Sequence, residues 1–413
     1  MHMPSNGGAD LILKEKQVHQ AKKLWSKLKP EQWPIDLQQL PKGTALVGGA
    51  VRDGLLDRLR ERPDLDLVVP EKAVILTRKL ADSLGGTCIV LDMERDIARL
   101  AFKGWTLDFA CQEGANLDAD LQRRDYRINA IALTLEANPL LLDPTGGIED
   151  LRLGRLVAVH EQNLLADPLR LLRGLRLMAE MDLTLDPTTL SWIEKHHHLL
   201  AKVAPERIQA ELQRLVNAPK ADLVLPLLET LKLLSTWQND ALGHLPKCLA
   251  AELLNQPEQE IALPLARLTH LLSDEGMARL RFSRKQQQRC QRLRQWQQRD
   301  DCHGYETLSD EDRVQLHLDL EADLPALILQ LPKAIQENWL LRWRNSQDPL
   351  FHPSPPVDGN VLQKLLELPP GPEIGNLIRH LCVEKAFRRI DDHEGAFLAA
   401  RRWLKQRHKA RCD

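Results

Sequence analysis

The chain has 413 residues, of which 43% are hydrophobic and 28% are charged, and its formal net charge at pH 7 is −2. This length suits two to four domains, and the composition is that of an ordinary water-soluble protein. No apolar run approaches the roughly 18 residues of a membrane span, and the first residues, MHMPSNGGADLILKEKQ, lack the apolar core of a signal peptide. We therefore expect a cytoplasmic protein that does not associate with membranes.

The cysteines and histidines give no sign of a structural metal site. The seven cysteines are scattered without a Cys-x-x-Cys pair, which argues against both a zinc site and a disulfide framework. His196, His197 and His198 are consecutive, so on a helix they point in three directions, and we interpret them as solvated polar residues. No feature of the sequence indicates a protein partner.

Short β-like runs alternate with helical stretches over about the first 145 residues, and β signals nearly vanish from about Leu151 onward. From there Leu, Ala, Gln, Glu and Arg recur at helical spacing. The β-like runs cover residues 44–51, 65–69, 87–91, 97–102, 105–110 and 130–136. The sequence therefore predicts an α+β protein, with a mixed head followed by an all-helical region.

The first β-like run ends in a pair of glycines. Gly48 and Gly49 lead into a helical stretch that carries Arg52 and Asp53. Glycine lets backbone N–H groups approach a phosphate, a helix N-terminus favours the anion, and Arg52 would add a forked cation. By itself the glycine pair is equally consistent with a tight structural turn.

Three carboxylates lie at or on two of the β-like runs. Asp64 and Asp66 stand two apart, so they project to the same side of a strand, about 7 Å apart at the backbone. Their repulsion favours a cation between them, and Mg²⁺ prefers oxygen ligands. Asp108 could complete a site that activates a hydroxyl nucleophile and stabilises a leaving pyrophosphate. A lone Asp-x-Asp is more often solvated, but the preceding glycines favour the functional interpretation.

The segment RRDYRINAIA, residues 123–132, carries Arg124, Asp125 and Asn129. On a helix-like stretch the last two residues share one face. Asp125 can accept a hydrogen bond from a ribose hydroxyl and Asn129 can both donate and accept, which suits the selection of a ribonucleotide. An N-cap aspartate beside solvated arginines is the alternative, and the residues alone slightly favour it.

Further along, Asp167 and Arg170 share a helix face at i and i+3, and Arg173 and Arg176 extend this face as a path for phosphates. A carboxylate that accepts from an exocyclic amine, beside a guanidinium that donates to a ring nitrogen, fits cytosine and adenine. Uracil and guanine present the opposite pattern, and each buried polar group left unpaired costs about 1–3 kcal/mol. An i,i+3 surface ion pair is the commoner meaning of this spacing.

Together these motifs resemble a known family. GGAVRD, DLDLVV, RRDYRINAIA, DPLRLLRGLRLMAEMDLTLDP and APERIQAEL follow one another as in the class II tRNA nucleotidyltransferases and bacterial poly(A) polymerases, over about residues 45–215. The resemblance implies a polymerase-β-like nucleotidyltransferase head domain and sugar recognition by RRDYRINAIA. It also implies that a Glu-Asp-x-x-Arg motif acts as a protein template for the base. Here Ala166 replaces the glutamate, which leaves both base-reading residues in place but could loosen their support.

Proline-rich stretches subdivide the helical region, above all DPLFHPSPPVDG near residue 350. We expect four domains: a catalytic head at 1–150, a helical neck that reads the base at 151–215, a helical body at 216–347 and a helical tail at 348–413.

Basic residues cluster in two segments of the body and tail. Residues 279–299, RLRFSRKQQQRCQRLRQWQQR, include eight basic residues and no acidic one. As a helix this segment would present a phosphate-binding face, although a solvated helix is equally consistent. The tail ends in the basic RRWLKQRHKAR and resembles the family's segment that holds the tRNA elbow, which implies tRNA as the partner.

These features predict an Mg²⁺-dependent enzyme that transfers CMP and AMP from CTP and ATP to the 3′ end of tRNA, adding CCA and releasing pyrophosphate. Asp64 and Asp66 would hold the metal ions, with Asp108 as the third carboxylate.

Three alternatives stay open. Some relatives add only CC and are associated with a shortened loop in the head, and here only 14 residues separate Asp108 from Arg123. A poly(A) polymerase is less favoured, because the Gly-Asp-Pro stretch usual in those relatives is missing ahead of Asp167. A non-catalytic RNA-binding module would not need paired carboxylates near RNA phosphate.

Overall fold

The computed structural model describes residues 7–238, 251–299, 305, 307–369 and 371–410. The chain divides into two compact units. The N-terminal unit comprises Met1–Val203 and Thr230–Leu233, and the C-terminal unit comprises Ala204–Glu229 and Leu234–Asp413. The finer division into head, neck, body and tail stays a prediction.

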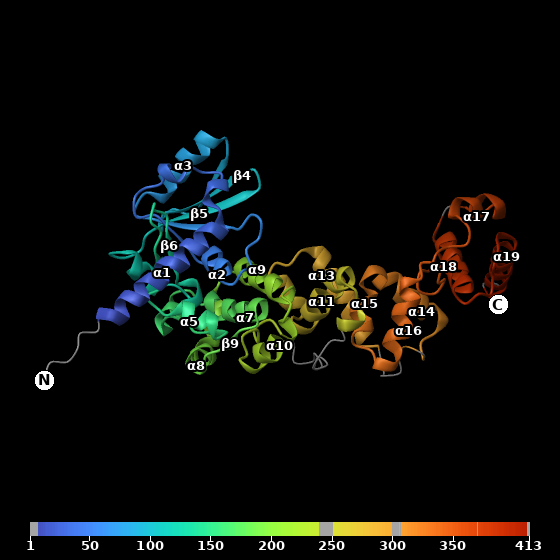
Figure 1. Ribbon diagram of the computed structural model, residues 1–413. Coiled ribbons are helices and arrows are strands. Elements are labelled where there is room, and N and C mark those ends of the chain that lie inside the picture. The colour runs from blue at the N-terminus through green and yellow to red at the C-terminus, as the bar shows by residue number, and fades with distance from the viewer. Residues whose placement is uncertain (1–6, 239–250, 300–304, 306, 370, 411–413) are drawn as a thin grey trace. The chain divides into compact units, whose positions relative to one another are not determined.

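A seven-stranded mixed sheet forms the centre of the N-terminal unit (Figure 1). The strand order is β3-β4-β5-β2-β1-β6-β7, in which β2 and β5 are parallel and the other neighbours are antiparallel. All six predicted β-like runs contribute strands, whereas β7, with two residues, is too short to show a period. The strands are β1 (Ala45–Val47), β2 (Leu65–Val69), β3 (Thr87–Asp92), β4 (Ile97–Phe102), β5 (Trp105–Cys111), β6 (Ala132–Thr134) and β7 (Leu141–Leu142).

Alternation along the two central strands separates the core from the predicted carboxylates. Leu67 in β2 and Phe109 in β5 are fully buried, whereas the neighbouring Asp66 and Asp108 are only partly covered. Because successive side chains of a strand point to opposite faces, the apolar residues fix the face on which the two carboxylates lie.

Helices α1 (Gly7–Leu28), α2 (Gly49–Leu55) and α3 (Ala73–Leu84) contact strands of this sheet. In α3, the residues Val74, Thr77, Leu80 and Ala81 are buried at helical spacing, and the helix packs against β4. Both side-chain oxygens of Asp96 accept backbone N–H groups of the first turn of α3, at 2.8 Å each. The α-helices of this unit are α1 (Gly7–Leu28), α2 (Gly49–Leu55), α3 (Ala73–Leu84), α4 (Leu117–Gln122), α5 (Gly147–Arg152), α6 (Glu161–Ala166), α7 (Leu169–Met181) and α8 (Pro187–His196).

The region after Leu151 is helical, as predicted, with one difference in detail. Two strands of two residues each, β8 (Arg155–Leu156) and β9 (Thr184–Leu185), pair in parallel. The pair is too short to give a β period in the sequence.

The described part of the C-terminal unit contains helices and turns but no strand. Its α-helices are α9 (Pro205–Val216), α10 (Ala221–Thr230), α11 (Gln256–Leu271), α12 (Asp274–Arg279), α13 (Arg284–Gln297), α14 (Asp310–Leu320), α15 (Leu324–Ile328), α16 (Lys333–Arg344), α17 (Gly359–Leu366), α18 (Pro372–Ala386) and α19 (His393–Ala410). The buried Arg267 in α11 donates to both carboxylate oxygens of Asp222, at 2.8 Å each, and so ties α11 to α10.

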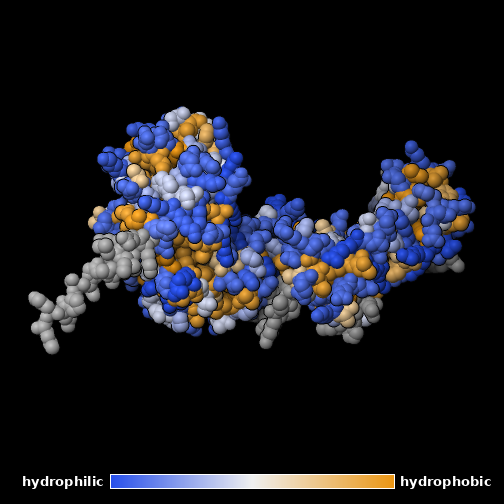
Figure 2. Space-filling model, in the orientation of Figure 1, coloured by the Kyte–Doolittle hydropathy of each residue, from blue (hydrophilic) through white to orange (hydrophobic). Residues whose placement is uncertain are grey.

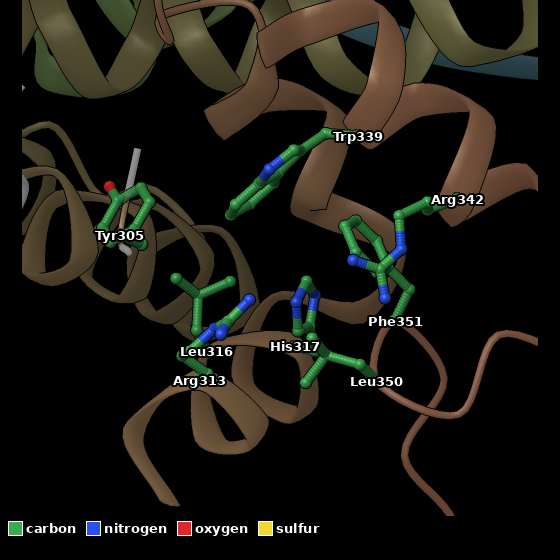
Figure 3. Close-up of a pocket in the computed structure, with 8 residues that line it drawn as sticks. All are labelled: Tyr305, Arg313, Leu316, His317, Trp339, Arg342, Leu350 and Phe351. Atoms are coloured by element: carbon green, nitrogen blue, oxygen red, sulfur yellow. The ribbon is translucent and has the colours of Figure 1, made fainter. Parts of the chain in front are cut away.

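A cluster of aromatic rings surrounds His317 of α14 (Figure 3). The ring centroid of His317 lies 4.2 Å from that of Phe351 and 5.6 Å from that of Trp339, and Arg313 and Arg342 also line the pocket between them. Burial, followed by the charge of Arg342, lowers the pKa of His317 to about 3. The pocket holds about 20 Å³, room for about one water molecule. It is therefore a packing centre of this unit, too small for a nucleotide.

The surface is largely polar. Figure 2 shows hydrophilic residues over much of the visible face, with hydrophobic residues distributed among them. In the part of the chain that the structure describes, no helix combines the length and the apolar character needed to cross a bilayer.

Candidate active site

Two central strands bring the predicted carboxylates together. In the parallel pair β2 and β5, Asp66 stands directly opposite Asp108, so both side chains project from the same face, about 4.8 Å apart at the backbone. Asp64 is exposed just before β2. Burial, then the charges of Asp108 and Asp64, raise the pKa of Asp66 to about 6, although Arg124 and the Gly49 N–H act in the opposite direction. The three carboxylates therefore form one electrostatic cluster.

The predicted glycine turn borders this cluster. β1 pairs with β2 so that Val47 stands opposite Asp66, and Gly48 follows at once. The φ of Gly48 is +71°, and a Cβ atom built on it would lie 3.0 Å from Oδ2 of Asp66 and 3.9 Å from Nη1 of Arg124. Gly48 therefore supplies both the unusual backbone conformation and the space beside the carboxylate that a larger residue would fill.

A chain of hydrogen bonds runs from α2, which follows this turn, to α7, the helix that is predicted to read the base. Arg52 donates from Nε to Oδ1 of Asp53 at 2.8 Å and from Nη1 to Oδ1 of Asn129 at 2.7 Å. Asn129 donates to Oδ1 of Asp125 at 3.1 Å, and Arg173 of α7 donates to Oδ2 of Asp125 at 3.1 Å. Three of the predicted nucleotide-binding motifs, those that carry Arg52, Asp125 and Arg173, are thus connected in one unit.

The predicted sugar motif differs from the expected helix. Only Arg127–Asn129 is helical, as a single 3-10 turn, and Asp125 and Asn129 bond to each other. Burial would raise the pKa of Asp125, but Arg173 and Arg170 outweigh it and hold the pKa below its usual value. Asp125 is therefore ionised, and since a carboxylate has about four lone pairs, the three hydrogen bonds that it accepts leave about one for a hydroxyl group.

Arg124 faces the glycine turn from the same motif. Its Nε and Nη2 donate to Oδ2 of the buried Asp120, at 3.3 and 3.1 Å, while Nη1 is the atom near Gly48. A fixed guanidinium beside a glycine turn suits an anionic ligand such as a phosphate. Asp120, which the sequence did not single out, positions this cation.

The predicted base-reading pair lies at the start of α7. Asp167 follows α6 and precedes Pro168, the N-cap of α7, so Asp167 and Arg170 do not share a helix face as expected. Nη1 of Arg170 donates to the backbone oxygens of Arg123 and Asn163, at 2.9 and 3.0 Å, and its buried Nε has no hydrogen-bond partner among the described residues. Arg170 is nevertheless held against the predicted sugar motif by its hydrogen bond to Arg123.

Tyr126 attaches α7 to this motif. Its hydroxyl donates to the backbone oxygen of Arg170 at 2.8 Å, and its ring is fully buried. A Cβ atom on Gly174 would lie 2.1 Å from the Tyr126 hydroxyl oxygen, so the ring fits only because α7 carries a glycine there. The signal in the sequence was a glycine in the otherwise leucine-rich helix LRLLRGLRLM.

Of the two arginines predicted to line a path for phosphates along α7, only one is accessible. Arg173 is partly exposed and contacts Asp125, whereas only 5% of Arg176 is exposed and it pairs with Glu180. The structure therefore places Arg176 in the packing around α7, and we leave it out of the nucleotide contacts proposed below.

Arg99 is the partner of Asp108 that sequence reasoning missed. Its Nε and Nη2 donate to Oδ1 and Oδ2 of Asp108, at 2.7 and 2.8 Å. The two residues stand opposite each other because Lys103 and Gly104 form the two-residue turn between β4 and β5. Such a turn fixes the register of a hairpin, so counting outward from Lys103-Gly104 could have found the pair.

The donor set suits a hard divalent cation, because Asp64, Asp66 and Asp108 offer carboxylate oxygens in one cluster and Asp66 has a raised pKa. Among the described residues, however, no three acidic, histidine or cysteine side chains are already gathered as a set of metal ligands. Both oxygens of Asp108 are instead engaged with Arg99.

The basic segment 279–299 is less free than its composition predicts. Four of its eight cations pair with acidic residues of the same unit, and Arg284, Lys285 and Arg292 of α13 are exposed and form no ion pair with described residues. The pairs are Arg281–Glu206, Arg289–Asp323, Arg294–Asp274 and Arg299–Asp312. Arg279, the eighth cation, donates to the backbone oxygen of Thr236. The candidate phosphate-binding face therefore narrows to the three exposed residues of α13.

Comparison with protein families finds two matches. Residues 44–157 match the poly A polymerase head domain, and residues 182–239 match the probable RNA and SrmB-binding site of polymerase A. The first match contains the glycine turn, the three carboxylates and the sugar motif.

Among known proteins, a CC-adding tRNA nucleotidyltransferase of Synechocystis sp. is 33% identical, covering 90% of this chain and 96% of the relative. A CC-adding tRNA nucleotidyltransferase of Geobacter sulfurreducens is 41% identical, over 43% of this chain and 41% of the relative. A CCA-adding enzyme of Geobacillus stearothermophilus is 34% identical, over 44% and 47%.

Solved structures share the fold. A CCA-adding enzyme with ATP superposes with a TM-score of 0.70 and 20% identity, over 92% of this chain and 98% of that one. The Thermotoga maritima CCA-adding enzyme complexed with tRNA gives 0.69 and 21%, over 87% and 91%. The predicted fold class, a nucleotidyltransferase head followed by helical domains, is confirmed. Nucleotidyltransferases of this family generally depend on a metal ion. The chain belongs to the family of template-independent tRNA nucleotidyltransferases and poly(A) polymerases.

Proposed function

We propose that this chain transfers CMP and AMP from CTP and ATP to the 3′ end of tRNA, so building the CCA end and releasing pyrophosphate. The observation that supports the proposal best is the meeting of three motifs within one unit. The carboxylate pair Asp66 and Asp108 lies beside the glycine turn, and hydrogen bonds connect that turn to α7. Its relatives supply the tRNA substrate class.

The carboxylates would hold the catalytic metal. Asp64 and Asp66 would bind Mg²⁺, with Asp108 as the third ligand. When bound, Mg²⁺ lowers the pKa of the attacking 3′-hydroxyl and neutralises charge on the leaving pyrophosphate. Gly48, Gly49, Arg52 and Arg124 would receive the triphosphate.

The second half of the site would choose the nucleotide. Asp125 and Asn129 would contact the ribose hydroxyls, while Asp167 and Arg170 would pair with the base edge. Cytosine and adenine both present an amine beside an unprotonated ring nitrogen, which matches a carboxylate and a guanidinium. A uracil or guanine would leave these polar groups unpaired, at about 1–3 kcal/mol each. Arg173 would support Asp125 in its ionised form.

Addition of CC alone is a second candidate, and one structural observation favours it. The connection from β5 to α4 consists of residues 112–116 only, so the head has no room there for a long loop. Two of the relatives described above are named as CC-adding enzymes, one of them over 96% of its length. An enzyme of this kind would need a separate A-adding partner.

One assay separates these possibilities. Purified enzyme and a tRNA that ends before its CCA would be incubated with CTP, with ATP or with both, and the products resolved by length. CCA addition predicts two added residues with CTP alone and three with both nucleotides. CC addition predicts two in either case, and a poly(A) polymerase would make long products with ATP alone. No extension with any mixture would contradict the proposal.

We place tRNA binding in the C-terminal unit and the enzyme in the cytoplasm. Arg284, Lys285 and Arg292 are the cations of α13 without an ionic partner in the described chain. They would contact RNA phosphates, so binding would weaken with salt. We also propose that the chain divides into the four domains predicted from the sequence: head, neck, body and tail.

A further inference from the structure

The pair formed by Arg99 and Asp108 lies beside the proposed metal ligands. Arg99 of β4 and Asp108 of β5 are cross-strand neighbours, and the guanidinium donates to both carboxylate oxygens at 2.7 and 2.8 Å. Asp108 is directly opposite Asp66 on its other side. Asp108 therefore lies between a fixed cation and the carboxylate that is expected to bind a metal ion.

Arg99 acts on the whole cluster and not only on Asp108. The charges of Asp108, Asp64 and Asp66 all raise the pKa of Arg99, after the hydrogen bond with Asp108. The three carboxylates carry a formal charge of −3, which Arg99 reduces to −2. In the part of the chain that the structure describes, no three potential ligands are gathered for a metal ion, while Asp108 is held by Arg99.

We propose that Arg99 is a positioning residue that competes with the metal ion for Asp108. The inference rests on the proposed function of the carboxylates. In the free protein Arg99 offsets the repulsion among them, and a divalent cation that arrives alone is repelled by the guanidinium. A cation that arrives with a nucleoside triphosphate brings negative phosphate charge, which attracts the Arg99 guanidinium. The competition for Asp108 therefore favours binding of the metal together with its nucleotide.

The test measures Mn²⁺ binding to the full-length protein without nucleotide. The electron paramagnetic resonance signal of free Mn²⁺ reports how much of the ion stays unbound. Two unit charges about 4 Å apart interact strongly inside a protein, and the same holds for Arg99 and a metal ion at the cluster. Because 42% of the Arg99 side chain is exposed, solvent screens much of this interaction. We therefore expect Arg99→Gln to bind Mn²⁺ about tenfold more tightly than the wild type, about 1.4 kcal/mol. Arg99→Lys, which keeps the charge, should stay within about threefold.

Two further variants isolate the cause. Arg152→Gln removes a more exposed cation that pairs with Glu149 elsewhere in the unit, and it should leave Mn²⁺ binding unchanged. In the Asp108→Asn background, adding Arg99→Gln should give a gain well below tenfold, because the competed ligand is already lost. Melting temperatures with and without Mn²⁺ provide a second readout, and the Mn²⁺-induced rise should be larger for Arg99→Gln than for the wild type.

Equal or weaker Mn²⁺ binding by Arg99→Gln would overturn the proposal, because a residue that merely orients Asp108 would weaken binding when removed. Asp66→Asn separates this result from a failure of the proposed function. If Asp66→Asn binds Mn²⁺ as the wild type does, the carboxylates are not the metal site, and the Arg99 proposal falls with that assignment.

Discussion

Gly48 and Asp66 illustrate how single residues of the site depend on their neighbours. The carboxylate of Asp66 is partly withdrawn from water and lies near two like charges, which raises its pKa to about 6. Gly48 leaves open the space next to that carboxylate. A site that must receive a polyphosphate and a cation needs such a combination of charge and free space, and each can be removed by one substitution.

Gly48→Ala should lower both stability and activity. The backbone at Gly48 has φ +71° and ψ −134°, a region that costs a side-chain-bearing residue about 1–3 kcal/mol. The new Cβ would also press on Oδ2 of Asp66. We expect urea denaturation to show this loss of about 1–3 kcal/mol in the free energy of unfolding. The turnover rate should be at least about tenfold lower, because a tenfold loss needs only about 1.4 kcal/mol of transition-state stabilisation.

Gly85→Ala is the matched control. Gly85 ends α3 with φ +68° and has open space around the position of a Cβ. It should cost about 1–2 kcal/mol of backbone strain and leave turnover unchanged. Equal losses of turnover in both variants would show that the effect of Gly48→Ala is only a loss of folded protein.

The residues that sequence reasoning identified are those that a local pattern defines. Alternation places Asp64 and Asp66 on one side of a strand, and a glycine pair after a strand marks a turn. Arg176 looked like a groove residue because spacing gives the face of a helix but not what covers it. Arg99 was missed because its role depends on the opposite strand, although the two-residue turn contains that information.

In the proposed site, α7 is the element that would most constrain base selection. It carries Arg170 and Arg173, and it is attached to the sugar motif by the Tyr126 hydroxyl and by the hydrogen bonds of Arg170 to Arg123 and Asn163. The position of the helix is thus fixed by hydrogen bonds to the backbone and by Tyr126, not by the groups proposed to pair with the base. A small displacement of α7 would move Arg170 relative to any bound base.

Gly174→Ala should displace this helix. The added methyl group would lie 2.1 Å from the Tyr126 hydroxyl oxygen, so either the ring or α7 must move. Overpacking of this kind costs about 1–3 kcal/mol. We expect a lower melting temperature and a higher KM for CTP, with tRNA affinity unchanged.

Gly375→Ala is the control for Gly174→Ala, because Gly375 lies inside helix α18 with open space at the Cβ position. It should stabilise the protein by up to about 1 kcal/mol, as alanine favours helix over glycine. If Gly174→Ala also stabilised the protein, the contact between Tyr126 and α7 would not be the constraint described here.

Elements with a clear period were predictable and short ones were not. Six strands were recognised from β-like runs, whereas β7, β8 and β9 have two residues each and show no period. The sugar motif was expected as a longer helix, but its chain turns once and returns to the sheet at β6. Asp167 was expected on the same helix as Arg170, yet Pro168 is the N-cap and α7 begins only at Leu169.

The molecule as a whole consists of two compact units. All the proposed nucleotide contacts lie in the N-terminal unit, which ends at Val203 apart from Thr230–Leu233. The sequence indicated the change from mixed to helical structure near Leu151, but compactness depends on contacts between distant residues, which no local pattern displays. Because each unit is compact by itself, the stability of the two units can depend differently on pH.

The C-terminal unit should lose stability as the pH falls from about 6.5 toward 3. Burial holds the pKa of His317 at about 3, whereas in the unfolded chain it is about 6.5. Between these values the unfolded state binds a proton that the folded state does not, so stability falls with the pH. Arg342 and Arg313 add to this effect and Asp348 opposes it.

Calorimetry from pH 7 to 4 would measure this dependence. His317→Phe, which keeps a ring in the aromatic cluster, should flatten the pH dependence of the melting temperature of the C-terminal unit. His393→Gln, at an exposed position of α19, should not. An identical slope for His317→Phe and the wild type would mean that other groups cause the acid sensitivity.

The most direct test of the carboxylate cluster as the catalytic centre is the rate of nucleotide addition by Asp66→Asn, with tRNA binding measured in parallel. The wild type should extend a tRNA that lacks its CCA when given Mg²⁺, CTP and ATP. Asp66→Asn should be slower by about a thousandfold or more, because a bound metal ion stabilises the charge of the transition state by several kcal/mol and this contribution would be lost. The variant should bind tRNA as tightly as the wild type. A variant that still adds nucleotides at the wild-type rate would contradict the assignment of this carboxylate cluster as the catalytic centre.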